Sequence, residues 1–90
     1  RIEANQGQAL FVQADAMQGE SLRAAAATIE RHWGSVGILV NAAGGNKAEA
    51  TLPPGSDFCE LSSQAWQEVF DLNLVGGLLL PCQVFGKSMV

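Results

Sequence analysis

Two short apolar runs in the chain are too brief for helices: A-L-F-V-Q at residues 9–13 and G-I-L-V at residues 37–40. Both are continuous rather than alternating, which is typical of parallel strands covered by helices on both faces. We therefore predict a strand at each run. Before the first, residues 1–5 are predicted to form a helical turn, with Gly7 as its left-handed exit.

A helical period follows the first run. Apolar side chains recur at 3.6-residue spacing from residue 21 to residue 33, and Gly34 marks the end. No good capping residue precedes this helix, so its first turn is expected to be weakly capped. His32 lies in the last turn, where positive charge suits the helix dipole, and we expect a solvated structural role for it. The stripe consists of Leu22, Ala25, Ala26, Ile29 and Trp33.

A second helix is predicted to begin at Ser62 or Ser63, whose hydroxyl can accept a first-turn N–H. The spacing of its apolar stripe includes Asn73, a polar amide on the face that should meet the core. A buried amide without partners costs about 1–3 kcal/mol, so we expect Asn73 to lie in a hydrogen-bond network. The alternative is a core Asn satisfied by its own helix. The stripe consists of Trp66, Phe70, Asn73 and Gly77.

Further along this helix, Gly76, Gly77 and Pro81 interrupt the pattern. Proline cannot donate an N–H to the carbonyl four residues before it, and glycine weakens a helix interior. We predict a kink or a break there.

The segment between the second run and the second helix, residues 46–61, is polar, contains P-P-G and has no periodicity. It is predicted to be a loop, and a loop of this length is usually functional or disordered. Lys47 is its only cation, and it either pairs with an acidic substrate or is solvated. Asp57 and Glu60 are expected to be solvated.

Composition argues against several partners. The 90 residues carry a net charge of −4 with only five Lys and Arg, so binding to a nucleic-acid backbone is not expected. The longest apolar run, residues 72–80, is interrupted by Asn73 and falls short of the ~20 residues that span a membrane. Cys59 and Cys82 have no C-x-x-C spacing and no nearby His, so we expect no metal site and the reduced thiols of a cytoplasmic protein.

The second predicted strand ends in a run of residues with almost no side chains. Asn41 is followed by Ala42, Ala43, Gly44 and Gly45. Small residues let a backbone approach a flat ligand, and ligands of open α/β sheets bind at the carboxyl ends of the strands. We therefore expect a ligand site at this strand end.

The sequence N-A-A-G at residues 41–44 resembles the N-[NA]-A-G motif of the short-chain dehydrogenase/reductase family. Asp15 after the first run, and D-L-N-L-V-G at residues 71–76, match further family signals in the family's order. The resemblance covers most of the chain, although Gly37 stands where the family usually has Asp. On this resemblance the chain is identified as a member of the family.

The resemblance implies an α/β fold, a partial Rossmann-type doubly wound parallel sheet. Residues 1–90 would be the central part of one NAD(P)-binding domain, incomplete at both ends, with only the third and fourth strands and their flanking helices. In the family's strand order, 3-2-1-4-5, these two strands are not neighbours. We therefore expect no direct pairing between them and open apolar patches.

The resemblance also implies the cofactor, NAD or NADP, and the residues that contact it. An Asp at the position of Asp15 accepts a hydrogen bond from the adenine amino group, and the next amide, that of Ala16, binds the ring edge. The alternative is that Asp15 only caps the following turn. The N-A-A-G residues lie against the cofactor in the family. The implied cofactor-binding residues are Asp15, Ala16, Asn41, Ala42, Ala43 and Gly44.

The implied reaction is hydride transfer between the nicotinamide and an alcohol/carbonyl pair. The family's catalytic set contains Tyr, Lys, Ser and Asn, and only the Asn, here Asn73, is matched. Its main-chain carbonyl holds a water in the family's proton relay. The sequence has no tyrosine and no glycine-rich phosphate loop, so we expect no activity from the 90 residues alone. No metal is implied.

A narrower resemblance is to members that are D-mannonate oxidoreductases or fructuronate reductases, which act on sugar acids; Cys82 stands where those more often have Thr. In the family, the helix between Ser62 and Lys87 often forms a dimer interface, so a homo-oligomer is expected. Two alternatives remain from other classes. One is a non-catalytic dehydrogenase-like module that senses the nucleotide, and the other is a small independent α/β interaction protein.

Overall fold

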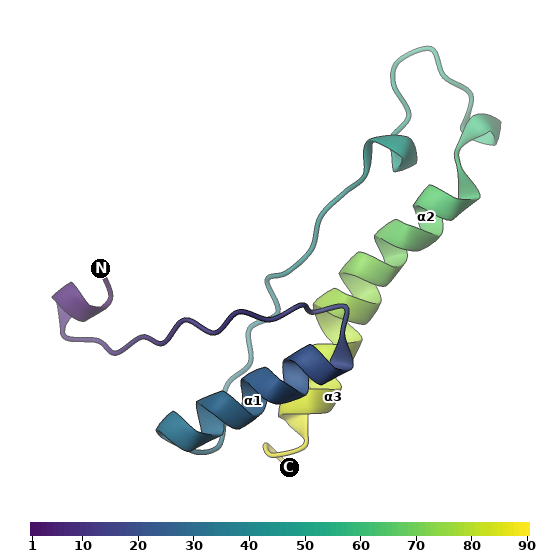
Figure 1. Cartoon of the computed structure of the whole chain (residues 1–90). Helices are drawn as coiled ribbons and strands as arrows, with labels where there is room; N and C mark the ends of the chain where they lie inside the picture. The colour runs from purple at the N-terminus through teal and green to yellow at the C-terminus, as the bar shows by residue number, and fades with distance from the viewer.

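The computed structural model describes all 90 residues and contains helices and extended segments, without a β-strand. The first helix, α1, spans Gly19–Trp33. A continuous helix of 24 residues, Ser63–Gly86, follows the long loop (Figure 1). It consists of α2 (Ser63–Phe70), a π-helical stretch η4 (Asp71–Leu79) and α3 (Leu80–Gly86). Three short 3₁₀ turns complete the elements: η1 (Glu3–Asn5), η2 (Ala48–Ala50) and η3 (Phe58–Glu60).

The predicted fold class, a partial doubly wound parallel sheet, is wrong for this chain. The chain is extended at residues 9–13 and 37–40 (Figure 1), but no ladder of backbone hydrogen bonds joins either segment to another segment of the chain. A strand exists only when a neighbouring strand takes up its N–H and C=O groups, and neither segment has one. The expectation that the two segments do not pair directly is confirmed.

Helix α1 packs its apolar stripe against α3. Leu22 and Ala25 are buried there, whereas Trp33 at the end of the predicted stripe is 52% exposed. The start is weakly capped, as predicted, because Gln18 makes no side-chain cap. Gly34 ends the helix as predicted, with φ +81° and its N–H donating to the Glu30 carbonyl. The helix begins two residues before the predicted start.

The long helix is capped at its start by the Ser62 hydroxyl, which accepts the N–H of Ala65 at 3.1 Å. Of the predicted kink or break, the break does not occur, because the helix continues through Pro81. In η4 the hydrogen bonds change register, so that the N–H of Leu80 donates to the carbonyl of Val75, five residues earlier. Pro81 then lies in the first turn of α3, where a residue without an N–H is tolerated.

The N-terminal turn also differs from the prediction. The left-handed residue is Gln6, with φ 65°, rather than Gly7. Gly7 instead donates its N–H to the Ile2 carbonyl at 2.9 Å. The exit of this turn is therefore one residue earlier than expected.

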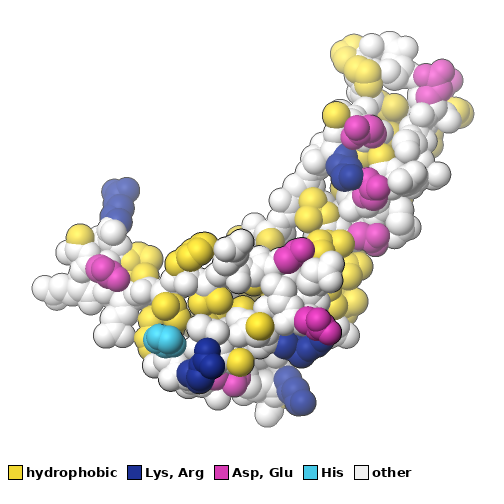
Figure 2. Space-filling view, viewed as in Figure 1, with side chains coloured by type: hydrophobic (Ala, Val, Ile, Leu, Met, Phe, Trp, Pro, Cys, Tyr) yellow, Lys and Arg dark blue, Asp and Glu magenta, His cyan; other side chains and the backbone are white.

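The molecule is elongated, with a radius of gyration of 17.2 Å and extents of 51 × 30 × 20 Å. The long loop and α2 project away from the body that α1 and α3 form (Figure 1). Figure 2 shows hydrophobic side chains on the surface from this body to the tip of the loop. Only six residues are buried, so most of the apolar surface lacks a partner within the chain.

By length and composition, the helix Ser63–Gly86 could cross a membrane, with a mean hydropathy of 1.5 over its most apolar window. The sequence prediction considered the unbroken apolar run alone, which is shorter than the helix. The core helix of a soluble protein has the same properties. The finding therefore does not by itself assign the helix to a bilayer.

Candidate functional site

The N-A-A-G motif lies along the long helix. We call residues 41–47 the motif segment. Its residues contact the helix in reverse sequence order. Asn41 contacts Cys82, Gly45 contacts Asn73, and Lys47 contacts Glu68. The motif segment is therefore antiparallel to the helix, and three side chains of the helix hold it in place.

The central contact is the side-chain amide of Asn73. Its Oδ1 accepts the Gly45 N–H at 3.0 Å, and its Nδ2 donates to the Gly45 carbonyl at 2.7 Å. A further bond from Nδ2 to the Val69 carbonyl, 2.8 Å long, joins the amide to its own helix. Asn73 thus presents to Gly45 the donor and acceptor that a neighbouring strand would present. The expected hydrogen-bond network of Asn73 is present, and two of its three bonds leave the helix.

Glycines let the motif segment and the helix approach this closely. A Cβ on Gly77 would lie 2.6 Å from the Ala43 carbonyl oxygen, and a Cβ on Gly44 would lie 2.5 Å from Oδ1 of Asn73. Both distances are shorter than real carbon contacts. A side chain at Gly77 would have to displace the backbone of the motif segment, and one at Gly44 would have to displace the Asn73 amide.

The neighbouring Gly76 packs against the turn that follows the first extended segment. A Cβ on Gly76 would lie 2.6 Å from Met17 Sδ and 3.3 Å from the Ala16 carbonyl oxygen. Gly76 and Gly77 are adjacent, so the turn at Ala16 and the motif at Ala43 pack against the same turn of the helix. The helix therefore brings together the two segments that the sequence assigns to the cofactor.

Asp15 organises the turn before α1. Its Oδ1 accepts the Met17 N–H at 2.9 Å, its carbonyl accepts the Gln18 N–H at 3.0 Å, and its own N–H donates to Ser21 Oγ at 2.8 Å. The turn-capping role weighed in the sequence analysis is therefore present. Asp15 is also exposed, as are the four residues of the N-A-A-G motif.

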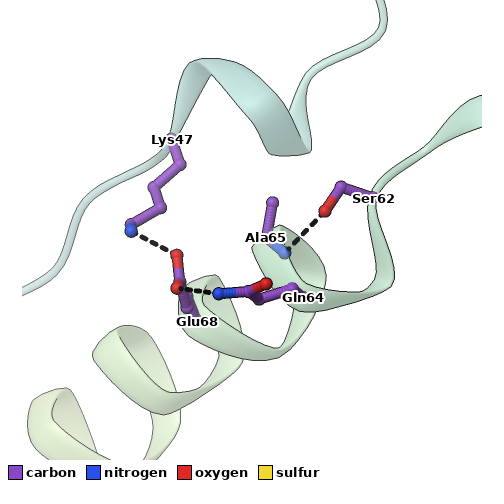
Figure 3. Close-up of polar contacts among 5 residues, drawn as sticks. All are labelled: Lys47, Ser62, Gln64, Ala65 and Glu68. Carbon is purple, nitrogen blue, oxygen red and sulfur yellow. Dashed lines mark hydrogen bonds and ion pairs between the residues drawn. The ribbon is translucent and has the colours of Figure 1, made fainter.

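The outermost contact is an ion pair between Lys47 and Glu68 (Figure 3). Gln64 Nε2 donates to the other oxygen of Glu68 at 3.3 Å. The hydrogen bond to Glu68 raises the pKa of Lys47 above its usual 10.5, and the hydrogen bond from Lys47 lowers the pKa of Glu68 below its usual 4.5. The two side chains are 44% and 40% exposed, so water screens the pair.

This pairing was not predicted. The sequence left Lys47 either solvated or ready for an acidic substrate, but within the chain its partner is Glu68. Asp57, expected to be only solvated, in fact caps η3 by accepting the Cys59 N–H at 2.9 Å. Lys47 and Glu68 are 21 residues apart, and no periodic signal connects a loop residue to a helix residue at that distance.

None of the three hollows of the surface is lined by the N-A-A-G residues 41–44. One of about 300 Å³ lies between η3 and the start of α2. An apolar one of about 220 Å³ touches Asn73 on the long helix, and a polar one of about 280 Å³ surrounds the Lys47–Glu68 pair. No cluster of His, Cys, Asp or Glu is arranged to hold a metal ion.

Comparison with known proteins places this arrangement in a family. The model of the short chain dehydrogenase family matches residues 1–90, the whole chain. Glucose 1-dehydrogenase 2 of Bacillus subtilis (strain 168) is 36% identical over 78 residues, which are 87% of this chain and 28% of the relative. The uncharacterized oxidoreductase UxuB of the same organism is 33% identical over 97 residues, which are 99% of this chain and 34% of the relative.

Among solved structures, a proposed D-mannonate oxidoreductase from Haemophilus influenza with bound NAD has 31% identity and a TM-score of 0.84. The match covers 99% of this chain and 35% of that one. The chain thus spans about a third of the length of the proteins it matches. The chain belongs to the short-chain dehydrogenase family.

Proposed function

We propose that this chain is part of an oxidoreductase that transfers a hydride between NAD or NADP and an alcohol or carbonyl substrate. The observation that carries the proposal is the joint seating of two segments on the long helix. Asn73 holds Gly45 by two hydrogen bonds, and Gly76 and Gly77 receive Ala16 and Ala43 side by side. NAD bound to the solved relative supports the choice of cofactor.

The residues fit a nucleotide. The N-A-A-G motif is exposed, and its small side chains leave room for a flat ring beside the backbone. Asp15 keeps an exposed carboxylate, which we assign to the adenine amino group, and we assign the Ala16 N–H to the ring edge. The proposed cofactor-binding residues are Asp15, Ala16, Asn41, Ala42, Ala43 and Gly44.

Asn73 is the proposed catalytic residue of this chain. Its side chain is engaged with Gly45 and Val69, so the group we assign to a proton relay is its main-chain carbonyl, which would hold a water. The nicotinamide, when bound, accepts or donates the hydride. The chain contains no tyrosine to act as proton donor, and we propose that the 90 residues alone do not catalyse the reaction.

For the substrate we propose a sugar acid such as D-mannonate or fructuronate, supported by the solved relative described as a proposed D-mannonate oxidoreductase. Lys47 pairs with Glu68, so we assign recognition of the substrate carboxylate to residues outside this chain. We also propose that the whole protein is cytoplasmic and assembles through the helix Ser63–Gly86, on which Leu74, Leu78 and Leu79 are about half exposed.

The test is a titration of the isotope-labelled chain with NAD and with NADP, followed by amide chemical shifts. We expect shifts at residues 15–16 and 41–44, and Asp15→Ala should weaken binding about tenfold by removing a charge-assisted hydrogen bond. The matched control is Asp57→Ala, since Asp57 accepts the N–H two residues on, at 2.9 Å, as Asp15 does. Equal loss in both variants, or shifts elsewhere, would refute the site.

An activity assay of the chain together with its flanking sequence distinguishes an enzyme from a nucleotide sensor. Translated with its flanking sequence, an oxidoreductase should reduce NAD or NADP with D-mannonate, whose alcohol gives up the hydride, or oxidise NADH or NADPH with fructuronate, whose carbonyl accepts it. Binding without turnover of any polyol or sugar acid would instead support a sensor, which the lack of a tyrosine in these 90 residues leaves open.

A further inference from the structure

The motif segment and the long helix match in spacing as well as in order. Gly45 and residue 47 are two extended residues apart, roughly 7 Å. Their partners Asn73 and Glu68 are five helical residues apart, also on the order of 7 Å. The ion pair can therefore form without disturbing the Asn73–Gly45 contact, and each contact supports the register of the other.

Lys47 is itself held in a closed turn. Its carbonyl accepts the N–H of Ala50 at 3.0 Å and the hydroxyl of Thr51 at 3.2 Å, and the same hydroxyl accepts Nδ2 of Asn46 at 3.0 Å. This turn contains η2, which packs against α2. The position of the Lys47 side chain therefore constrains the backbone that follows Gly45.

Glu68 is equally well placed on its helix. Gln64, one turn earlier, donates to Oε1 and leaves Oε2 for Lys47 (Figure 3). Glu49 adds a favourable charge near Lys47 but makes no hydrogen bond to it. Of the two acids near the ammonium group, only Glu68 connects the motif segment to the long helix.

We propose that Glu68 is a positioning residue, which through Lys47 sets the register of the motif segment on the long helix and so orients residues 41–44 toward the nucleotide. The orienting effect rests on the proposed cofactor site. The register itself does not, because it is a property of the free chain.

The experiment measures hydrogen exchange of the Gly45 amide, whose N–H donates to Asn73 and so reports the register directly. Glu68→Gln removes the charge and keeps the size. We expect exchange at Gly45 to rise about 1.5- to 5-fold, the range for loss of an exposed ion pair. The charge-swapped double variant, Lys47→Glu with Glu68→Lys, should restore the slow exchange.

The matched control is Asp71→Asn, which removes the same charge from the same helix. Asp71 accepts Gln67 Nε2 at 2.9 Å and makes no hydrogen bond to the motif segment. The proposal is overturned if Gly45 exchanges as fast in Asp71→Asn as in Glu68→Gln. It is also overturned if Gly45 exchange stays fast in the charge-swapped double variant.

Nucleotide binding provides the second readout. In Glu68→Gln the dissociation constant for NAD should rise, by at most the factor seen in Gly45 exchange, because affinity falls only as the population of the docked register falls. In Asp71→Asn it should not change. If the wild-type chain does not bind NAD, the proposed function fails, while Gly45 exchange still decides the register. A rise in exchange with unchanged NAD affinity overturns the orienting role.

Discussion

The side chain of Asn73 makes three hydrogen bonds, two of them to a residue 28 positions earlier. Each is worth about 0.5–1.5 kcal/mol net, so this one amide contributes as much to the tertiary structure as a buried aliphatic side chain. The sequence predicted that Asn73 needs partners, because it lies on an apolar stripe. It could not identify Gly45, since a backbone group has no side-chain signature.

The Lys47–Glu68 ion pair makes the contact between the motif segment and the long helix dependent on pH. The pKa of Glu68 is lowered from 4.5, so its contribution is complete above pH 4.5 and is lost as pH falls through the lowered pKa. The pKa of Lys47 is raised from 10.5, so its contribution is complete below pH 10.5 and is lost as pH rises through the raised pKa. The pair is therefore fully formed between these limits.

We predict that the Lys47 amide shift stays constant from pH 5 to neutral pH and moves below pH 4.5 as Glu68 is protonated. A pH titration followed by amide shifts measures this. Glu68→Gln should show no such transition, because it has no carboxylate to titrate there. A transition of the same size in that variant would show that Glu68 is not the group that titrates.

At the scale of elements, helices were predictable and the paired strands were not. The 3.6-residue period of α1 and the Ser62 cap are local, so they act within one turn of chain. A strand requires hydrogen bonds to a second segment, and an apolar run at 9–13 or 37–40 carries no information on whether that neighbour is present. The runs therefore indicated extended chain correctly and a sheet wrongly.

The disturbance of the long helix was predicted at the right place. Gly76, Gly77 and Pro81 indicated a kink or a break, and the helix does not break but changes to a π-helical register in η4 before α3. A π-helical register removes the conflict at Pro81, and such stretches often occur at functional sites. The motif segment packs against Gly77, and the helix sequence alone does not contain that contact.

Gly77→Ala tests that packing. The new methyl group would meet the Ala43 carbonyl oxygen at 2.6 Å, and a backbone atom cannot move aside cheaply. The matched control is Gly86→Ala in α3, where nothing lies within 4 Å. Gly86 is the last residue of the helix, so alanine gains less helix propensity there than at the interior Gly77, and any greater loss of stability at Gly77 comes from the contact. Gly77→Ala should be about 1–3 kcal/mol less stable than Gly86→Ala in denaturant unfolding followed by helical circular dichroism. Equal stabilities would mean that the motif segment does not press on the helix.

At the scale of the whole molecule, the chain exposes more surface than a compact protein of its size. Its accessible surface is 6892 Å², against about 5,000 Å² expected for 9.5 kDa. Its radius of gyration, 17.2 Å, exceeds the roughly 12 Å expected for 90 residues. Phe11 and Ile38 in the extended segments are more than four-fifths exposed. Surfaces of this kind are usually covered by other polypeptide.

Two surfaces compete to associate, the extended segments and the long helix. We predict that the chain self-associates through the helix, because Leu74 and Leu78, 48% and 49% exposed, lie one turn apart on a rigid element that loses little entropy on binding. Insertion into a bilayer is disfavoured, because Glu68 and Asp71 would have to enter it. The extended segment at Ile38 has unpaired backbone groups, but ordering it costs more.

Sedimentation velocity over a dilution series, with and without lipid vesicles, decides between these surfaces. Leu78→Glu should weaken association at least tenfold by placing a charge in the apolar contact, whereas Ile38→Glu, a matched change in the extended segment, should leave it unchanged. The reverse result would mean that the chains join through their extended segments, by strand addition at an unpaired edge. Sedimentation of the wild-type chain with the vesicles would instead mean that the helix Ser63–Gly86 binds the bilayer.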